Sequence, residues 1–158
     1  MAGATMERTD AEALLEPLRE QWAVLLRTRK RDGSWVATPV NLAVEGDRAY
    51  FGTPAGSGKV KRLRNFDAVE LAPCTPRGKP TGVSVAARAR RLEGEEAAAA
   101  RARMVRKYPF VHRFLVPLEL RLKRVHEVHY ELDRFRPLEG RDTAPGVGAA
   151  QLADTLAA

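Results

Sequence analysis

Apolar and polar residues alternate along six short stretches of this chain, the pattern of strands that bury one face. The alternation is clearest in residues 20–29 and 35–44, where every second position is apolar or threonine. Asp32-Gly33 lies between these two runs and predicts a tight hairpin turn. Pro39 removes one backbone donor from the second run, so we expect a bulge or a sheet edge there. The predicted strands are residues 20–29, 35–44, 48–53, 68–73, 83–92 and 124–133.

Helical spacing of apolar residues is found in the segments between and before these strands. Pro17 limits the first helix to a few turns. The third helix has two glutamates in its first turn and two basic residues in its last, which suits the helix dipole, and Pro109 ends it. The predicted helices are residues 8–18, 58–65, 94–108 and 110–116.

The order of these elements predicts the fold class. The first three strands follow one another directly, whereas a doubly wound α/β fold needs a helix between successive strands. The predicted fold is therefore mainly β with inserted helices (α+β), an antiparallel six-stranded sheet that closes toward a barrel. Residues 1–136 are expected to form this single domain with its N-terminal helix, and residues 137–158 a flexible C-terminal tail.

Composition narrows the class of protein. The 158 residues are 44% apolar, which is typical of a globular domain with a substantial core. No run of 18 or more apolar residues is present, so we expect no membrane-spanning helix and no membrane partner. The N-terminal stretch lacks the basic and then apolar order of a signal peptide. The single cysteine, Cys74, cannot form an internal disulfide, and we therefore expect a cytoplasmic protein.

The formal charge of +7 and the pI near 10.1 favour an anionic partner, although a solvated basic surface without a specific partner gives the same excess. Sites for single-stranded nucleic acid usually interleave aromatic residues with the cations. Between Gly56 and Arg106 the only aromatic residue is Phe66. We therefore expect a small anionic molecule and no nucleic acid.

Residues 48–65 contain the most candidate ligand-binding groups of any segment. In this segment a predicted strand leads into a glycine-rich turn, and the turn leads into a basic helix. Gly56 and Gly58 let backbone N–H groups approach a ligand, and the helix N-terminus adds donors and a partial positive charge. Four cations follow within the helix: Lys59, Lys61, Arg62 and Arg64. A phosphate is the predicted ligand, and an ordinary strand–helix connection is the alternative.

This turn does not have the spacing of the common nucleotide motifs. A P-loop needs a glycine five positions before Gly58 and a serine or threonine after the lysine, but Thr53 and Val60 occupy those positions. No Gly-x-Gly-x-x-Gly follows a strand, so a Rossmann dinucleotide site has no support.

The histidines do not predict a metal site or a catalytic triad. His126 and His129 are three residues apart, which would suit a metal pair on a helix, but on a strand they point to opposite faces. His112 follows Pro109 and has no role that the sequence assigns. No protein-borne nucleophile is evident, so a bound cofactor would carry any redox chemistry.

Several segments stand out together in their order and spacing: residues 25–29, Arg31-Asp32-Gly33, Ala37-Thr38-Pro39-Val40, Tyr50-Phe51-Gly52-Thr53, Ser57-Gly58-Lys59-Val60-Lys61-Arg62-Leu63-Arg64-Asn65 and Leu71-Ala72-Pro73-Cys74. Over about residues 20–135 they resemble the pyridoxamine 5′-phosphate oxidase-like superfamily. This resemblance implies a split β-barrel of the FMN-binding-like type, a flavin or deazaflavin cofactor, and a homodimer with the cofactor near its interface. The most similar branch is that of the PPOX-class coenzyme F420-dependent oxidoreductases.

The resemblance also implies which residues bind the cofactor at the turn: Thr53, Ser57, Gly58, Lys59, Val60, Lys61 and Arg62. Thr53, Ser57 and Lys59 correspond to the family's phosphate-binding positions. The family's flavin-type oxidases place an arginine where Gly58 stands, so the usual phosphate clamp for FMN is incomplete here.

A second segment implied by the resemblance is Thr38, Pro39 and Val40, which match the strand that lies along the isoalloxazine-like ring. Asn41 stands where an aromatic residue is frequent in this branch. The leading hypothesis is a deazaflavin (coenzyme F420)-dependent oxidoreductase that transfers a hydride to an unsaturated or quinone-like organic substrate. An FMN-binding oxidoreductase of the same fold and a non-catalytic cofactor carrier are the alternatives. The substrate and the proton donor are not identified by the sequence.

Overall fold

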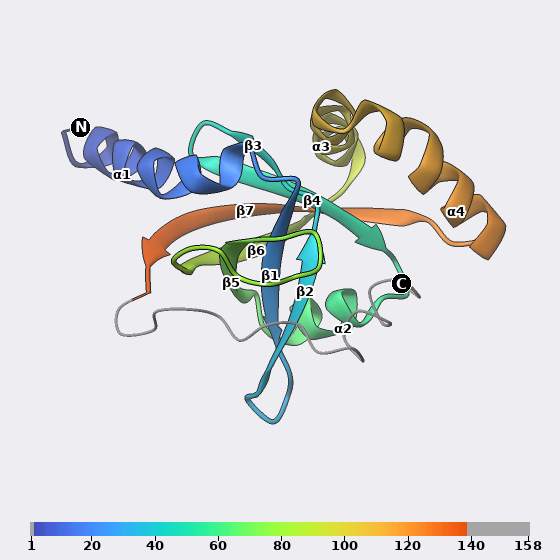
Figure 1. Ribbon diagram of the computed structural model, residues 1–158, viewed down its shortest axis with the longest axis horizontal. Helices are drawn as coiled ribbons and strands as arrows, with labels where there is room; N and C mark the ends of the chain where they lie inside the picture. The colour runs from blue at the N-terminus through green and yellow to red at the C-terminus, as the bar shows by residue number, and fades with distance from the viewer. Residues whose placement is uncertain (1, 139–158) are drawn as a thin grey trace.

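The computed structural model describes the backbone of residues 2–138 and the side chains of residues 8–138. The strands are β1 (Ala23–Arg29), β2 (Trp35–Val40), β3 (Ala43–Glu45), β4 (Arg48–Pro54), β5 (Ala68–Cys74), β6 (Val85–Leu92) and β7 (Glu127–Pro137). The helices are α1 (Ala2–Arg19), α2 (Gly58–Asn65), α3 (Gly94–Lys107), the π-helical η1 (Val111–Leu115) and α4 (Val116–Lys123). All strand pairs are antiparallel, in the order β2-β1-β5-β6-β7-β4-β3 (Figure 1).

The α+β class with a curled antiparallel sheet is confirmed, but within residues 2–138 the sheet has seven strands and not the predicted six. The predicted strand 35–44 is two strands, since β2 pairs with β1 at one sheet edge and β3 pairs with β4 at the other. The chain leaves β1 after Val40, where the side chain of Asn41 turns back and its Nδ2 donates to the carbonyl of Trp22 over 2.9 Å. Only two residues join β2 to β3, so the two edges lie close together and the sheet curls into a half barrel.

Several predicted boundaries differ from the observed ones. The first helix runs from Ala2 to Arg19 with Pro17 inside it, because the burial of Leu15 and Leu18 against the core outweighs the backbone bond that the proline removes. The predicted helices 58–65 and 94–108 are confirmed as α2 and α3. The helical turn after Pro109 continues through η1 and α4.

At the C-terminal end, β7 reaches Pro137, the first residue of the predicted tail, where it pairs with β6. Pro137 therefore belongs to the sheet, although the composition of residues 137–158 predicted a flexible tail from this residue onward. Residues 139–158, the rest of the predicted tail, lie outside the described residues.

The core fills the inside of the curled sheet with apolar side chains from β1, β4, β5 and β7. Phe51 and Tyr130 stack with ring centroids 5.2 Å apart, and Leu15 and Leu18 of α1 close one end. In Figure 1, α1, α3 and α4 lie along the upper side of the sheet and α2 lies below it. Five fully buried side chains mark the centre: Val24, Leu26, Phe51, Leu71 and Leu132.

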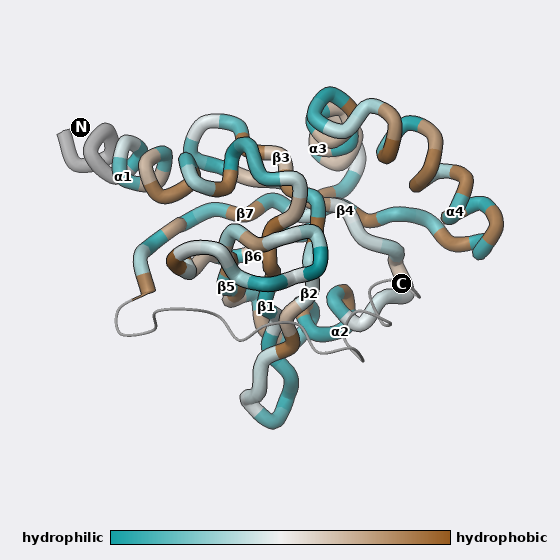
Figure 2. The backbone as a smooth tube through the Cα atoms, viewed as in Figure 1, coloured by the Kyte–Doolittle hydropathy of each residue, from teal (hydrophilic) through white to brown (hydrophobic). Residues whose placement is uncertain are grey.

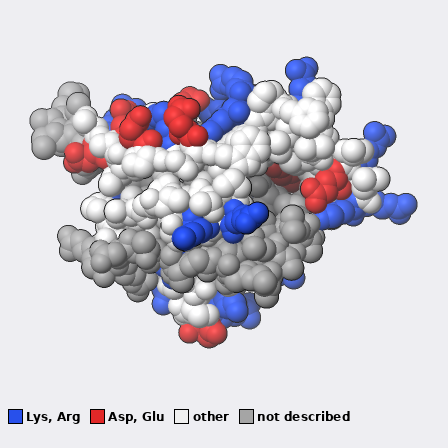
Figure 3. Space-filling model, in the orientation of Figure 1, with Lys and Arg blue, Asp and Glu red and all other residues white. Residues whose placement is uncertain are grey.

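The surface is charged without a single dominant patch on the face of Figure 3, where Lys and Arg are dispersed over several elements and Asp and Glu lie among them. Within residues 2–138, no helix is both long enough and apolar enough to cross a bilayer.

Candidate functional site

The glycine-rich turn links β4 to α2 and is held by two hydroxyls. Ser57 is the N-cap of α2, and its Oγ accepts from the Val60 N–H at 3.5 Å. The Thr53 and Ser57 hydroxyl oxygens lie 3.0 Å apart at the end of β4, and one donates to the other. These contacts fix the first turn of α2, whose leading N–H groups have no partner within a helix and attract anions.

The predicted cations of α2 lie in three different environments. The Lys59 side chain is buried, whereas Lys61 is exposed. Arg62 folds back toward the sheet and its Nε donates to Thr28 Oγ1 at 2.7 Å. A Cβ on Gly58 would lie 2.7 Å from Arg62 Nη1, so the guanidinium stands beside the position where a side chain at residue 58 would begin. Arg62, one turn later in the helix, therefore places a cation beside Gly58.

A pocket of about 160 Å³ lies beside this turn and joins the two predicted segments. Four sequence-predicted residues line it, since Pro39 and Val40 come from the end of β2 while Thr53 and Lys59 come from the turn. The remaining lining residues are Asn41, Gly52, Pro54, His112, Val116, Glu119, Leu120 and Glu127.

The other predicted residues lie behind or beside this pocket and do not line it. Val60 is packed into the core, and Ser57 is committed to capping α2. Thr38 is buried in β2, and its hydroxyl has no hydrogen-bond partner among the described residues. The three remaining residues, Gly58, Lys61 and Arg62, belong to the first turns of α2 outside the pocket.

Asn41 and His112 form the polar end of the pocket. The Asn41 Nδ2 donates to the Trp22 carbonyl, and its Oδ1 lies 3.2 Å from His112 Nε2. An amide oxygen only accepts, so His112 Nε2 carries the proton in this contact. Burial, together with the nearby His129 and Arg101, lowers the pKa of His112 to about 4, so the ring is neutral at pH 7.

One face of β7, a strand that packs against α3, carries a row of polar side chains that are largely buried. Glu127, His129 and Glu131 alternate with the core residues of the same strand. Glu131 is paired, because Arg48 Nη1 donates to it at 2.6 Å and Arg90 Nη2 at 3.2 Å. Within residues 8–138, no three His, Cys, Asp or Glu side chains are grouped to hold a metal ion.

Glu127 lines the pocket, and His129 lies next to it on β7, opposite Gly52 in the β4–β7 ladder. His129 Nε2 lies 3.7 Å from Glu127 Oε1 and has no hydrogen-bond partner among the described residues. A Cβ on residue 52 would lie 2.8 Å from Glu127 Cδ, so the missing side chain of Gly52 leaves the space that the carboxyl fills. Burial raises the pKa of Glu127 to about 7, and burial lowers the pKa of His129.

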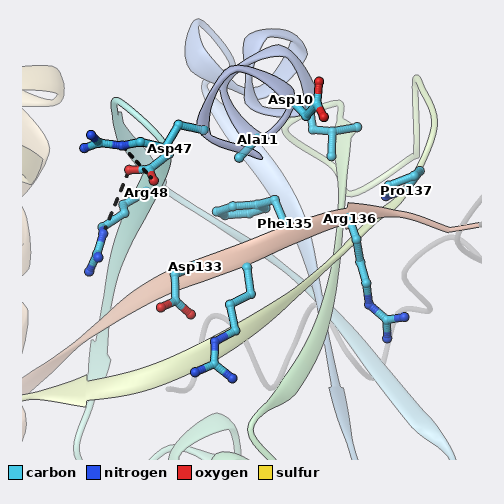
Figure 4. A pocket seen from close by; sticks show the side chains of 11 residues that line it. Asp10, Ala11, Asp47, Arg48, Asp133, Phe135, Arg136 and Pro137 are labelled. Atoms are coloured by element: carbon cyan, nitrogen blue, oxygen red, sulfur yellow. Dashed lines mark ion pairs between the residues drawn. The ribbon is translucent and has the colours of Figure 1, made fainter. Parts of the chain in front are cut away.

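A second pocket, about 710 Å³, lies between α1, β7 and the β3–β4 turn (Figure 4). Its lining mixes both signs of charge, with Asp47 held by Arg8 at 3.7 Å and by Arg48 at 3.9 Å. Phe135 lies beneath α1, close to Ala11. None of the sequence-predicted cofactor residues lines this pocket, so the smaller one beside α2 is the candidate site.

No protein-family model matches this sequence, and no curated protein matches it. Solved structures share its fold. The heme storage protein HutZ from Vibrio cholerae is 13% identical, with a TM-score of 0.58, over 81% of this chain and 89% of HutZ. A heme binding protein from Mycobacterium smegmatis is 17% identical, with a TM-score of 0.56, over 86% of this chain; the chain spans only 57% of that protein.

A third similar structure is a proposed pyridoxamine 5′-phosphate oxidase from Listeria innocua, which is 12% identical over 82% of this chain and 98% of that one, with a TM-score of 0.50. At these identities the likeness shows the fold. The chain thus has the split-barrel fold of pyridoxamine 5′-phosphate oxidase-like proteins, as the resemblance implied.

Proposed function

We propose that this protein is a deazaflavin (coenzyme F420)-dependent oxidoreductase that reduces an unsaturated or quinone-like organic substrate. The observation that carries the proposal is the pocket in which the end of β2 meets the glycine-rich turn. Pro39 and Val40 line this pocket together with Thr53 and Lys59, and the pocket has a volume of about 160 Å³. Apolar and cationic groups are thus brought together in the arrangement that a planar ring bearing a phosphate needs.

The residues present fit such a cofactor. Lys59 is a buried cation at the N-terminus of α2, and the Arg62 guanidinium lies beside the same first turn. Together they would hold the phosphate, while Pro39 and Val40 would form the apolar wall against the ring. Gly52 has no side chain to narrow the pocket. When bound, a reduced deazaflavin supplies a hydride equivalent, and the protein supplies position, exclusion of water and protons.

The test is a fluorescence titration of the purified protein with coenzyme F420. We expect micromolar binding, with affinity about 10-fold or more weaker in Lys59→Ala, because a charge-assisted contact from a buried cation contributes about 1.5–3 kcal/mol. Arg64→Ala is the matched control, since this arginine is exposed on the same helix and its loss should change affinity less than about 3-fold. Absence of binding by the wild type, or equal affinity in Lys59→Ala, would contradict the proposal.

FMN in the same site is the second candidate, because Arg62 restores a cation next to Gly58. A purified protein that is yellow with a flavin spectrum would favour this cofactor. A protein that binds either cofactor tightly and reduces neither quinones nor enones would instead be a carrier.

We further propose that the protein is a homodimer. Figure 2 shows apolar residues along η1 and α4. Four side chains in these helices or at the N-cap of η1 are more than half exposed: Phe110, Phe114, Leu118 and Leu122. Exposed apolar faces of this kind mark interaction sites. The other side of α4 lines the pocket through Val116 and Leu120, so a second copy here would border the cofactor site.

Sedimentation of the wild type and of Leu122→Glu tests the dimer. We expect the wild type to sediment as a dimer and the variant as a monomer, because a charge at this position would be buried without a partner. Val83→Glu is the control, since Val83 is also largely exposed, at 67%, but does not belong to α4. A monomeric wild type would contradict the proposal.

A further inference from the structure

Glu127 is the one carboxyl that β7 places in the wall of the candidate pocket. Its side chain is 12% exposed, and its carboxyl lies against the backbone of Gly52 on the neighbouring strand. Pro54, the residue paired with Glu127, also lines the pocket. The carboxyl therefore faces the space where a substrate would lie, and it is shielded from bulk solvent on its other sides.

The groups around Glu127 decide its charge. No arginine or lysine forms an ion pair with it among the described residues, and burial raises its pKa to about 7 with only a small opposing effect from Arg101. A carboxyl with this pKa is about half protonated at neutral pH, which suits a general acid. The titratable groups that face it or the pocket come from each packed element: His129 on β7, Arg101 on α3, His112 on η1, Glu119 on α4 and Lys59 on α2.

Neither histidine nor the second glutamate is placed as well to donate. His112 is neutral, and its Nε2 proton is engaged with Asn41. His129 lies behind Glu127 and does not line the pocket. Glu119 is engaged in an ion pair with Lys123 at 2.8 Å.

We propose that Glu127 is the general acid that protonates the substrate reduced in this pocket. This assignment rests on the proposed function. In an α,β-unsaturated ketone the β-carbon gains the hydride equivalent, and the electron pair of the double bond moves to the α-carbon. That carbon forms a C–H bond with the proton of the Glu127 carboxyl, whose O–H bond breaks and leaves a carboxylate. The substrate gains one hydride, which carries both electrons and comes from the reduced deazaflavin, and one proton, and the carboxylate recovers a proton from water.

The experiment compares wild type, Glu127→Gln and Glu95→Gln with reduced coenzyme F420 and two acceptors. Cyclohex-2-enone needs a proton at carbon, whereas menadione gives a hydroquinone whose oxygens take protons readily from water. We expect Glu127→Gln to reduce the enone about 30-fold or more slowly, because general acids contribute about 10²–10⁴-fold. Menadione reduction and cofactor affinity should change less than about 3-fold. Glu95→Gln removes an exposed carboxylate outside the pocket and should match the wild type.

Two readouts do not depend on the variant's activity. Infrared spectra of the ligand-free protein should show a protonated carboxyl band that disappears as the pH rises through about 7 and that is absent in Glu127→Gln. In the wild type, the enone rate should fall through the same pH range while the menadione rate does not.

Equal enone rates in Glu127→Gln and wild type would overturn the assignment while leaving the proposed function standing, and so would the absence of a titrating band. A wild type that binds no deazaflavin contradicts the proposed function itself, and with it the role of Glu127.

Discussion

Replacing Gly52 by alanine tests whether this glycine makes room for the carboxyl of Glu127. The added Cβ would lie 2.8 Å from Glu127 Cδ and 3.1 Å from His129 Nε2, and closer still to Glu127 Oε1. The flexible carboxyl can swing into the pocket, whereas the His129 ring is buried opposite residue 52. Overpacking of a core costs about 1–3 kcal/mol of unfolding free energy. Because the carboxyl can move and relieve part of the crowding, we expect a loss in the lower part of this range, about 1–2 kcal/mol.

Urea unfolding followed by tryptophan fluorescence measures this loss, with an unchanged m-value expected because the folded state stays compact. Gly56→Ala is the matched control, since no described atom lies within 4 Å of its added Cβ, and its stability should change by less than about 0.5 kcal/mol. In the double variant Gly52→Ala/Glu127→Ala the carboxyl that the new methyl group would crowd is gone. The double variant should therefore lose about 1 kcal/mol less unfolding free energy than the sum of the losses of the two single variants. Equal midpoints for Gly52→Ala and Gly56→Ala would refute the reasoning.

Three further changes have defined outcomes. Glu70→Ala removes the carboxylate 2.5 Å from Arg27, and both side chains are under 10% exposed, so we expect a loss of about 3–5 kcal/mol in urea unfolding; less than about 1 kcal/mol would contradict this. Ser57→Ala removes the N-cap of α2 and should cost about 1 kcal/mol and speed amide exchange in that helix, whereas unchanged exchange would show that the cap contributes nothing. Burial raises the pKa of Glu127 from 4.5 to about 7, so the folded state holds a proton that the unfolded chain has released. As the pH rises from about 5 to 8, the unfolding free energy of the wild type should therefore fall by about 3 kcal/mol at most relative to that of Glu127→Gln. A difference in unfolding free energy that stays constant over this range would contradict the raised pKa.

The half of the pocket made by β2 and the turn could be predicted, because each part is carried by a continuous motif. Pro39 and Val40 belong to one short segment, and Thr53 and Lys59 to another. Their meeting follows from sheet curling, which the sequence indicates through consecutive strands. The split of the predicted strand 35–44 was missed because its alternation continues unbroken through Leu42, and only tertiary pairing moves the last part to the opposite edge.

The helical wall could not be predicted for a different reason. From Val116 to Lys123 apolar and charged residues alternate with the period of a strand, yet the segment is helical. Proline in its first turn and the Glu119–Lys123 pair at 2.8 Å favour the helix. A period of two on a helix sends leucines to both sides, so Leu120 lines the pocket while Leu122 is exposed.

The environment of Glu127 and His129 could not be predicted from the sequence. The alternation along residues 124–133 correctly predicts that one face of this strand is polar. It does not indicate that α3 covers that polar face, which depends on contacts between segments about 30 residues apart. Burial of this face raises the pKa of Glu127, and no local sequence pattern predicts that burial.

The place of β7 in the sheet has a consequence for how the chain is made. Among the described residues it is the last strand in sequence, yet it lies between β6 and β4 and joins two groups of strands that do not otherwise pair. During synthesis, the groups β2-β1-β5-β6 and β4-β3 can form early, but each ends in an unpaired edge until residues 127–137 leave the ribosome. A chain truncated before Glu127 should therefore aggregate through these edges, whereas a chain that includes β7 pairs both of them with a single strand.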